Sequence, residues 1–189
     1  MASSEYTNSV YLLTLGFFFV FAAFNTVQLL ESSVLSDKNL AFTTLSTIYA
    51  VFAATNIVAP KVVSLLGPRL GMFLGSMCYV LLVVANIAPS WGTLVPASAL
   101  VGVGAGVLWT SQGIYMSRCA AREARATGEK VDDITGRFNG IFWAGFQLNG
   151  AAGLLLAALL KVRRRWRARQ RRGGRGPAPP RSCPALARP

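Results

Sequence analysis

The stretch TLVPASALVGVGAGVLWTSQGIYM, residues 93–116, decides the fold class because it contains no Asp, Glu, Lys or Arg. A helix of about 20 apolar residues is long enough to cross a hydrocarbon core of roughly 30 Å. Four other charge-free stretches are equally long: residues 10–30, 40–60, 70–88 and 139–160. Buried helices of a soluble protein rarely lack a polar face in this way. The sequence therefore predicts an all-α membrane protein that crosses the bilayer about five times.

The charges gather at the C-terminal end. Only 14% of the 189 residues are charged, against about a quarter in soluble domains, and 11 of the 19 Lys and Arg residues follow position 160. Residues 161–189 are rich in Arg, Gly, Pro and Ala, a composition that predicts a disordered basic tail. Three interpretations stay open for this tail. The first is a non-native segment that arises from a shifted or truncated reading frame. The second is a segment that contacts anionic lipid, and the third, least favoured, is a segment that binds nucleic acid.

The first apolar stretch has an alternative interpretation as a secretory signal peptide. The residues before it include Glu5 and no Lys or Arg, whereas a signal peptide begins with positive charge. Its apolar run also continues through Leu30, which is long for a signal. We therefore expect a first membrane span.

The distribution of positive charge predicts the orientation. Residues 61–69 carry two basic residues and the longer loop expected at residues 117–138 carries five, whereas the loops after the first and third spans carry one and none. The positive-inside rule then places the N-terminus and these two segments in the cytoplasm. After five spans the basic tail would lie on the opposite side, so either the tail inverts the orientation or it does not belong to the fold.

The residue types exclude several kinds of chemistry. The chain has no His, and its three cysteines, Cys78, Cys119 and Cys183, have no paired spacing, so we expect neither a disulfide framework nor a zinc site. The spans lack the ionisable groups of a proton relay, a nucleophile or a metal site. We expect no enzymatic activity, no cofactor and no nucleic-acid partner, with the lipid bilayer as the surrounding medium.

Small and polar residues inside the spans carry more information. Gly71 with Gly75, and Gly102 with Gly106, form small-xxx-small pairs that favour close helix packing. Amides and aromatic residues recur at helical spacing and predict either a shared central cavity or hydrogen bonds that hold the helices together. These candidate residues are Asn25, Gln28, Thr47, Asn56, Trp109, Gln112, Tyr115, Asn139, Trp143 and Gln147.

The segment between the second and third spans resembles the cytoplasmic signature loop of the major facilitator superfamily. That pattern has a Gly, an Asp four residues later, and then Gly and Arg. Here Pro60 and Ser64 replace the first Gly and the Asp, while Gly67 and Arg69 remain. The missing carboxylate removes one partner of the charge pairing that the resemblance implies.

Five further segments resemble the unc-ninety-three-like group, the ion channel regulatory branch of that superfamily. They are residues 45–49 (LSTIY), 88–91 (APSW), 94–98 (LVPAS), 108–115 (LWTSQGIY) and 138–143 (FNGIFW). The resemblance implies a fold of twelve spans in two halves, of which this chain supplies a part that ends before the sixth helix. It also implies a role in potassium channel regulation, in ion homeostasis or in escorting membrane receptors.

Three functional expectations follow. The leading one is a multi-pass membrane protein that regulates or accompanies a channel. The second is a solute transporter of the major facilitator superfamily, with Asn25, Gln28, Gln112 and Gln147 lining its route. The third is a truncated product without independent activity, because alternating access requires two halves that move against each other.

Overall fold

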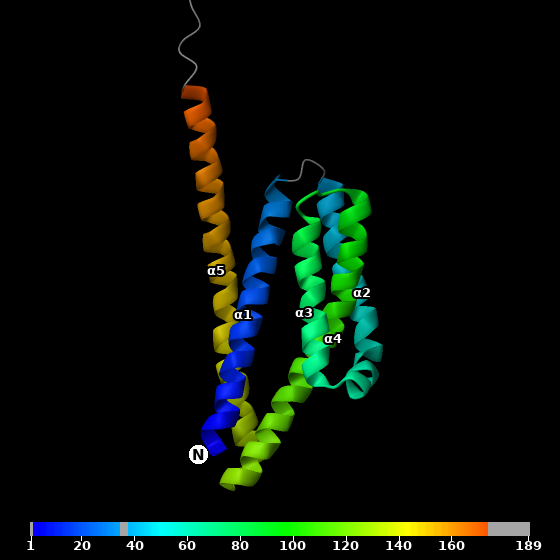
Figure 1. Cartoon of the computed structure of the whole chain (residues 1–189), viewed down its shortest axis with the longest axis vertical. Coiled ribbons are helices and arrows are strands. Elements are labelled where there is room, and N and C mark those ends of the chain that lie inside the picture. The colour runs from blue at the N-terminus through cyan, green and yellow to red at the C-terminus, as the bar shows by residue number, and fades with distance from the viewer. Residues whose placement is uncertain (1, 35–37, 174–189) are drawn as a thin grey trace, which may run out of the picture. The chain divides into compact units, whose positions relative to one another are not determined.

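The computed structural model describes residues 2–34 and 38–173, which form five helices with short connections (Figure 1). The helices are α1 (Ala2–Val34), α2 (Lys38–Leu66), α3 (Pro68–Ala85), α4 (Trp91–Thr127) and α5 (Val131–Gly173). Each holds a stretch long and apolar enough to cross a membrane: Tyr6–Leu29, Lys38–Leu66, Pro68–Ala85, Trp91–Thr127 and Val131–Arg163. The predicted all-α class with about five spans is confirmed for the described residues.

The chain divides into two compact units, Met1–Ala157 and Ala158–Pro189, which are described separately. The first unit holds α1 to α4 and the larger part of α5. In the second unit, residues 158–173 are helical, so the expectation of a disordered tail from residue 161 is wrong up to Gly173. Arg, Ala and Gln in this stretch favour a helix, and no Gly or Pro interrupts it before Gly173. The remainder of the predicted tail, with Cys183, lies outside the described residues.

Helix α4 is the central packing element of the first unit, and α2 packs along it. At Gly102, an added Cβ would lie 2.6 Å from a side chain of α2. At Gly106, it would lie 2.7 Å from the Cγ2 atom of Thr55. Real Cβ atoms do not approach so closely, so the two helices can meet here only because both positions are glycine. The predicted packing role of this pair is confirmed.

Helix α3 packs on α4 through its own glycine pair. A Cβ at Gly75 would lie 2.7 Å from the carbonyl oxygen of Gly104, and one at Gly71 would overlap the side chain of Ser111. Glycines on both helices therefore bring the two backbones together, as small residues do between membrane helices.

A single residue, Gly67, separates α2 from α3. Its φ of 81° lies in a region that favours glycine, and Pro68 starts α3 in a position where the absent N–H is not needed. The second span was expected to end at Pro60, yet α2 runs through this proline to Leu66. Helices in membranes accommodate proline where neighbouring groups satisfy the freed backbone atoms.

The other connections are also short. Ser90 caps the start of α4 in a capping box with Thr93, so this helix begins at Trp91, two residues before the expected span. Gly128, with a φ of 77°, ends α4, and only residues 128–130 separate it from α5. The longer loop expected at residues 117–138 is therefore wrong. Ala, Arg and Glu in this segment are strong helix formers, so the helix continues where the apolar run stops.

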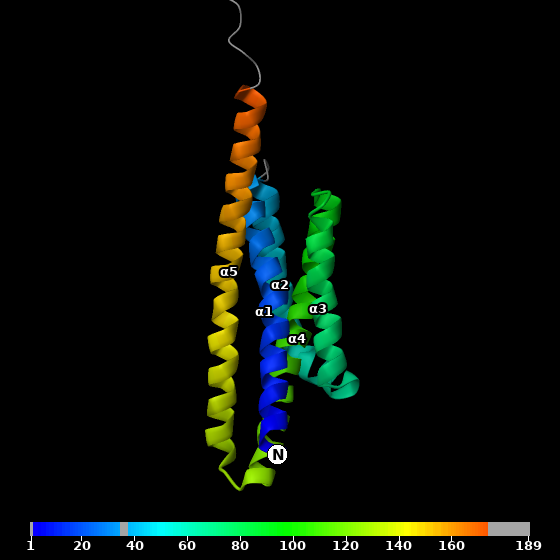
Figure 2. The same cartoon turned by 60° about the vertical axis from the view of Figure 1, so that its left-hand side comes forward.

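Helix α1 and the part of α5 up to Ala157 lie side by side in both views (Figures 1 and 2). The ring of Phe17 meets that of Phe142 at 5.2 Å, and the side chains of Asn25 and Asn149 are hydrogen-bonded. The N-terminus, the α2–α3 turn and the α4–α5 connection lie at one end of the unit, and the α3–α4 turn lies at the other. This arrangement groups the segments that were predicted to share the cytoplasmic side.

Candidate functional site

An aromatic cluster fills the space between α1, α4 and α5. Trp109 of α4 is at its centre, stacked on Trp143 of α5 at 6.0 Å and meeting Phe17 and Phe21 of α1 edge-on or tilted. Trp109 also meets the rings of Phe142 and Phe146, and Phe21 continues the cluster to Phe24 and Tyr79. Trp109 and Trp143 were both candidates from their spacing, and the structure brings them together. Their surroundings are packed rings, which favour rigid helix packing in this part of the bundle.

A first cavity, of about 450 Å³, lies between α1, α2 and α5 and contains two further candidates. We call it the Glu31 cavity; it is lined by Asn25, Gln28, Leu29, Glu31, Ala41, Leu45, Gly150 and Leu154. The Nδ2 atom of Asn25 donates a hydrogen bond to Oδ1 of Asn149 at 2.5 Å. Polar groups on α1 thus face an otherwise apolar wall.

The carboxyl of Glu31 is the charged group of this cavity, and only 7% of the residue is exposed. It lies two residues beyond the span Tyr6–Leu29. Burial raises the pKa of Glu31, and a hydrogen bond with the side chain of Asn86 partly offsets that rise. Glu31 was not among the candidates because it had been assigned to the connection after the first span.

The candidate residues of α5 recur at every fourth position along one stripe of the helix, and this stripe does not face α1. Asn139, Trp143 and Gln147 are all exposed, whereas Phe142 and Asn149 are buried. The inward face therefore runs through residues 142, 146, 149 and 153, one position away from the predicted stripe. The i, i+4, i+7, i+11 spacing of two phenylalanines, an asparagine and a glycine was the signal that would have identified this face.

A second cavity, of about 590 Å³, lies at the end of the unit that holds the α2–α3 turn. We call it the arginine cavity; its polar lining is Tyr6, Ser9, Arg69, Tyr115, Arg118 and Arg122, beside Gly67 and Pro68. Tyr115, Gly67 and Arg69 were singled out from the sequence, and the structure brings them together. Arg118 and Arg122 were missed because the segment that carries them was taken for a loop.

The remaining candidates are dispersed. Gln112 and Asn139 line a small cavity of about 250 Å³ between α4 and α5. Thr47, Asn56, Pro60 and Ser64 line none of these cavities, and all but Thr47 are exposed. One central cavity shared by all the candidates stays a prediction.

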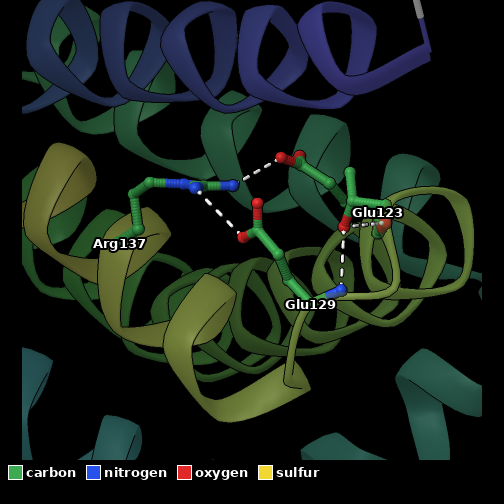
Figure 3. A network of polar contacts seen from close by, with 4 residues as sticks. Glu123, Glu129 and Arg137 are labelled. Carbon is green, nitrogen blue, oxygen red and sulfur yellow. Dashed lines mark hydrogen bonds and ion pairs between the residues drawn. The ribbon is translucent and has the colours of Figure 1, made fainter.

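An ion pair with one fully buried partner joins α4 to α5 (Figure 3). The guanidinium of Arg137 lies 2.6 Å from Oε1 of Glu123, whose side chain is fully buried, and 3.3 Å from Oε2 of the exposed Glu129. Glu123 Oε2 has no hydrogen-bond partner among the described residues. Among those residues, no three His, Cys, Asp or Glu side chains are grouped closely enough to hold a metal ion.

Comparisons with known proteins agree on one family. The sequence matches the family described as ion channel regulatory protein UNC-93 over residues 32–147. It is 37% identical over 153 residues to protein unc-93 homolog A of Bos taurus, a match that covers 80% of this chain and 34% of that protein. It is 38% identical over 161 residues to UNC93-like protein 3 of Arabidopsis thaliana, which covers 85% and 34%. The match to UNC93-like protein MFSD11 of Xenopus tropicalis is 32% over 157 residues, covering 80% and 33%. The chain therefore spans about a third of the length of the curated relatives that it matches.

Proposed function

The chain belongs to the UNC-93 family of ion channel regulatory proteins, and on that premise we propose that it regulates a potassium channel through contact within the membrane. The observation that carries the proposal is the family match over residues 32–147, which extends from α1 into α5. The proposal assigns the chain no catalytic role. It places the chain in the bilayer as a multi-pass protein with its N-terminus in the cytoplasm.

The exposed stripe of α5 supports a protein partner. Trp143 is 49% exposed, and Asn139 and Gln147 lie one turn to either side of it on the same face. An amide that faces lipid, as the exposed Gln147 would, costs free energy, which a partner helix offering hydrogen bonds would offset. The stacking of Trp143 on Trp109 holds the indole in place, so little side-chain entropy is lost when a partner binds.

The proposal is tested by co-expressing the 189-residue chain with potassium channels, one at a time, in oocytes. We expect the chain to change the steady-state potassium current of its partner channel by at least about twofold. Such a change requires only about 0.4 kcal/mol of coupling, because about 1.4 kcal/mol corresponds to tenfold. The double variant Trp143→Ala/Gln147→Ala should lose this effect. Leu148→Ala is the matched control, because Leu148 is 63% exposed on the same helix but outside the stripe.

Surface biotinylation, which measures the amount of each protein in the membrane, separates altered regulation from altered expression. An effect that survives the double variant would exclude the stripe as the contact. No change of current with any channel would favour the third expectation, a product without activity of its own.

A second candidate function, solute transport, is favoured by the Glu31 cavity, which contains Asn25 and Gln28. In sealed liposomes that hold only this chain, a transporter would give substrate-dependent flux. Alanine at Asn25, Gln28, Gln112 and Gln147 should then abolish the flux. Flux that survives all four substitutions would exclude this route.

A further inference from the structure

Glu31 is a buried carboxylate with an unmet hydrogen-bonding capacity. Only 7% of the residue is exposed, and its Oε1 atom has no hydrogen-bond partner among the described residues. The side chain of Asn86, where α3 ends, forms a hydrogen bond with the carboxylate. The ion pairs found among those residues involve Arg137 and do not include Glu31. A buried charge without an opposite charge is costly, so this arrangement calls for a cationic ligand or a bound proton.

Two amide side chains lie beside this carboxylate. Asn25, Gln28 and Glu31 are spaced three residues apart on α1, which puts them on neighbouring turns of one helix face. All three line the Glu31 cavity. The donor group of Asn25 is used in its bond to Asn149, which leaves the amide oxygen of Asn25 to act as an acceptor. The cavity thus offers oxygen atoms from one carboxylate and two amides.

The number and kind of these groups define the ligand. Carboxylate and amide oxygens are hard ligands that suit hard cations, and a single negative charge is neutralised by a single positive one. We propose that Glu31, Gln28 and Asn25 form a binding site for an alkali cation, sodium or potassium, in the Glu31 cavity. The other lining residues, such as Ala41, Leu45 and Leu154, form apolar walls that strengthen the electrostatic attraction.

This site goes beyond the proposed regulation of a channel, because it needs no partner protein. It is therefore tested on the purified 189-residue chain in detergent, and a negative result here leaves the regulatory proposal untouched. The same chain could fail to regulate a channel and still bind the cation.

The test is thermal unfolding, followed by circular dichroism, in sodium, potassium or choline chloride at equal ionic strength and neutral pH. We expect sodium or potassium, but not choline, to raise the unfolding temperature saturably, by about 3 °C at ten times the dissociation constant. The separate sodium and potassium series show which of the two ions binds. Glu31→Gln should abolish the shift, and Gln28→Leu should weaken the apparent affinity.

Glu129→Gln is the matched control, because it removes an exposed carboxylate that lies outside the cavity, and it should keep the full cation response. Direct binding of radioactive sodium or rubidium to the purified chain provides a second readout. If Glu31→Gln does not fold, the Gln28→Leu series and the binding assay decide. Equal unfolding temperatures in all three salts, or a cation response retained by Glu31→Gln, would overturn the proposal. If the unfolding temperature responds to pH but not to cations, the site binds a proton instead, and this result would also overturn the proposal.

Discussion

At the scale of single residues, two buried carboxylates near opposite ends of the first unit have different surroundings. Glu123 is fully buried and meets the guanidinium of Arg137, which links α4 to α5 at 2.6 Å. Glu31 meets the neutral side chain of Asn86. Paired carboxylates tie helices together, whereas an unpaired one favours whatever can neutralise it. The two residues therefore predict different responses to substitution and to pH.

Arg137→Ala should destabilise the bundle by about 1–3 kcal/mol, because it leaves the buried carboxylate of Glu123 without its charged partner. Glu129→Gln removes only the exposed carboxylate that also contacts Arg137, and it should cost less than about 1 kcal/mol. Thermal unfolding of the purified variants in detergent measures both effects. Equal losses for the two variants would contradict the central role of the Glu123–Arg137 pair.

The protonation of Glu31 predicts a pH dependence. Burial raises its pKa above the ordinary value of 4.5, so the folded chain holds the proton more tightly than the unfolded chain does. This contribution to stability is complete below pH 4.5 and is lost as the pH rises through the raised pKa. In choline buffer, the unfolding temperature of the wild type should therefore fall relative to that of Glu31→Gln across this window. Parallel pH curves for the two proteins would contradict the assignment.

At the scale of the elements, glycines determine how closely the helices approach. Gly102→Ala should destabilise the chain by about 1–3 kcal/mol, because the new methyl group would overlap α2. Gly113→Ala, on the same helix, has nothing within 4 Å of the added Cβ and should instead gain up to about 1 kcal/mol of helix propensity. If both variants shift the unfolding temperature in the same direction, the close contact between α2 and α4 is ruled out.

The sequence was sufficient to predict which segments span the membrane but not where the helices end. Absence of charge marks the hydrocarbon core, and it placed four of the five spans within the observed helices. The third span, expected over residues 70–88, extends past the end of α3 at Ala85. A helix of 37 residues such as α4 is about 55 Å long, well beyond a core of roughly 30 Å. Its last turns, with Arg118 and Arg122, carry charge because they leave the core, and a charge-based prediction takes them for a loop.

The site was predicted only in part, for a related reason. The spacing of Gly102 pointed to a packing face, which the structure confirms. The spacing of Trp109 pointed to a cavity or to interhelical hydrogen bonds, whereas its ring packs among other aromatic rings. Asn149 was missed because it lies off the stripe through Trp143, and the inward face of α5 depends on the position of α1. Glu31 was missed because the first span was expected to end at Leu30, although Glu31 continues the spacing of Asn25 and Gln28 on α1. Its place in a cavity depends on α2 and α5, which no pattern within α1 indicates.

At the scale of the whole molecule, the alternating helix directions predict a membrane topology. The α2–α3 turn and the end of α4 should be accessible from the cytoplasm, and the α3–α4 turn from the opposite side. After replacement of the native cysteines, Ser64→Cys and Ser117→Cys should react with a membrane-impermeant maleimide only from the cytoplasmic side. Ser90→Cys should react only from the other side. Labelling of Ser64→Cys and Ser90→Cys from the same side would contradict the topology.

The most direct test of the central claim is potassium flux in liposomes that contain a purified potassium channel, this chain, or both. The account predicts no flux with the chain alone and a channel flux that changes when the chain is present. The change should be lost with Trp143→Ala/Gln147→Ala and retained with Leu148→Ala. Flux carried by the chain alone, or a channel flux that the chain leaves unaltered, would contradict the regulatory role.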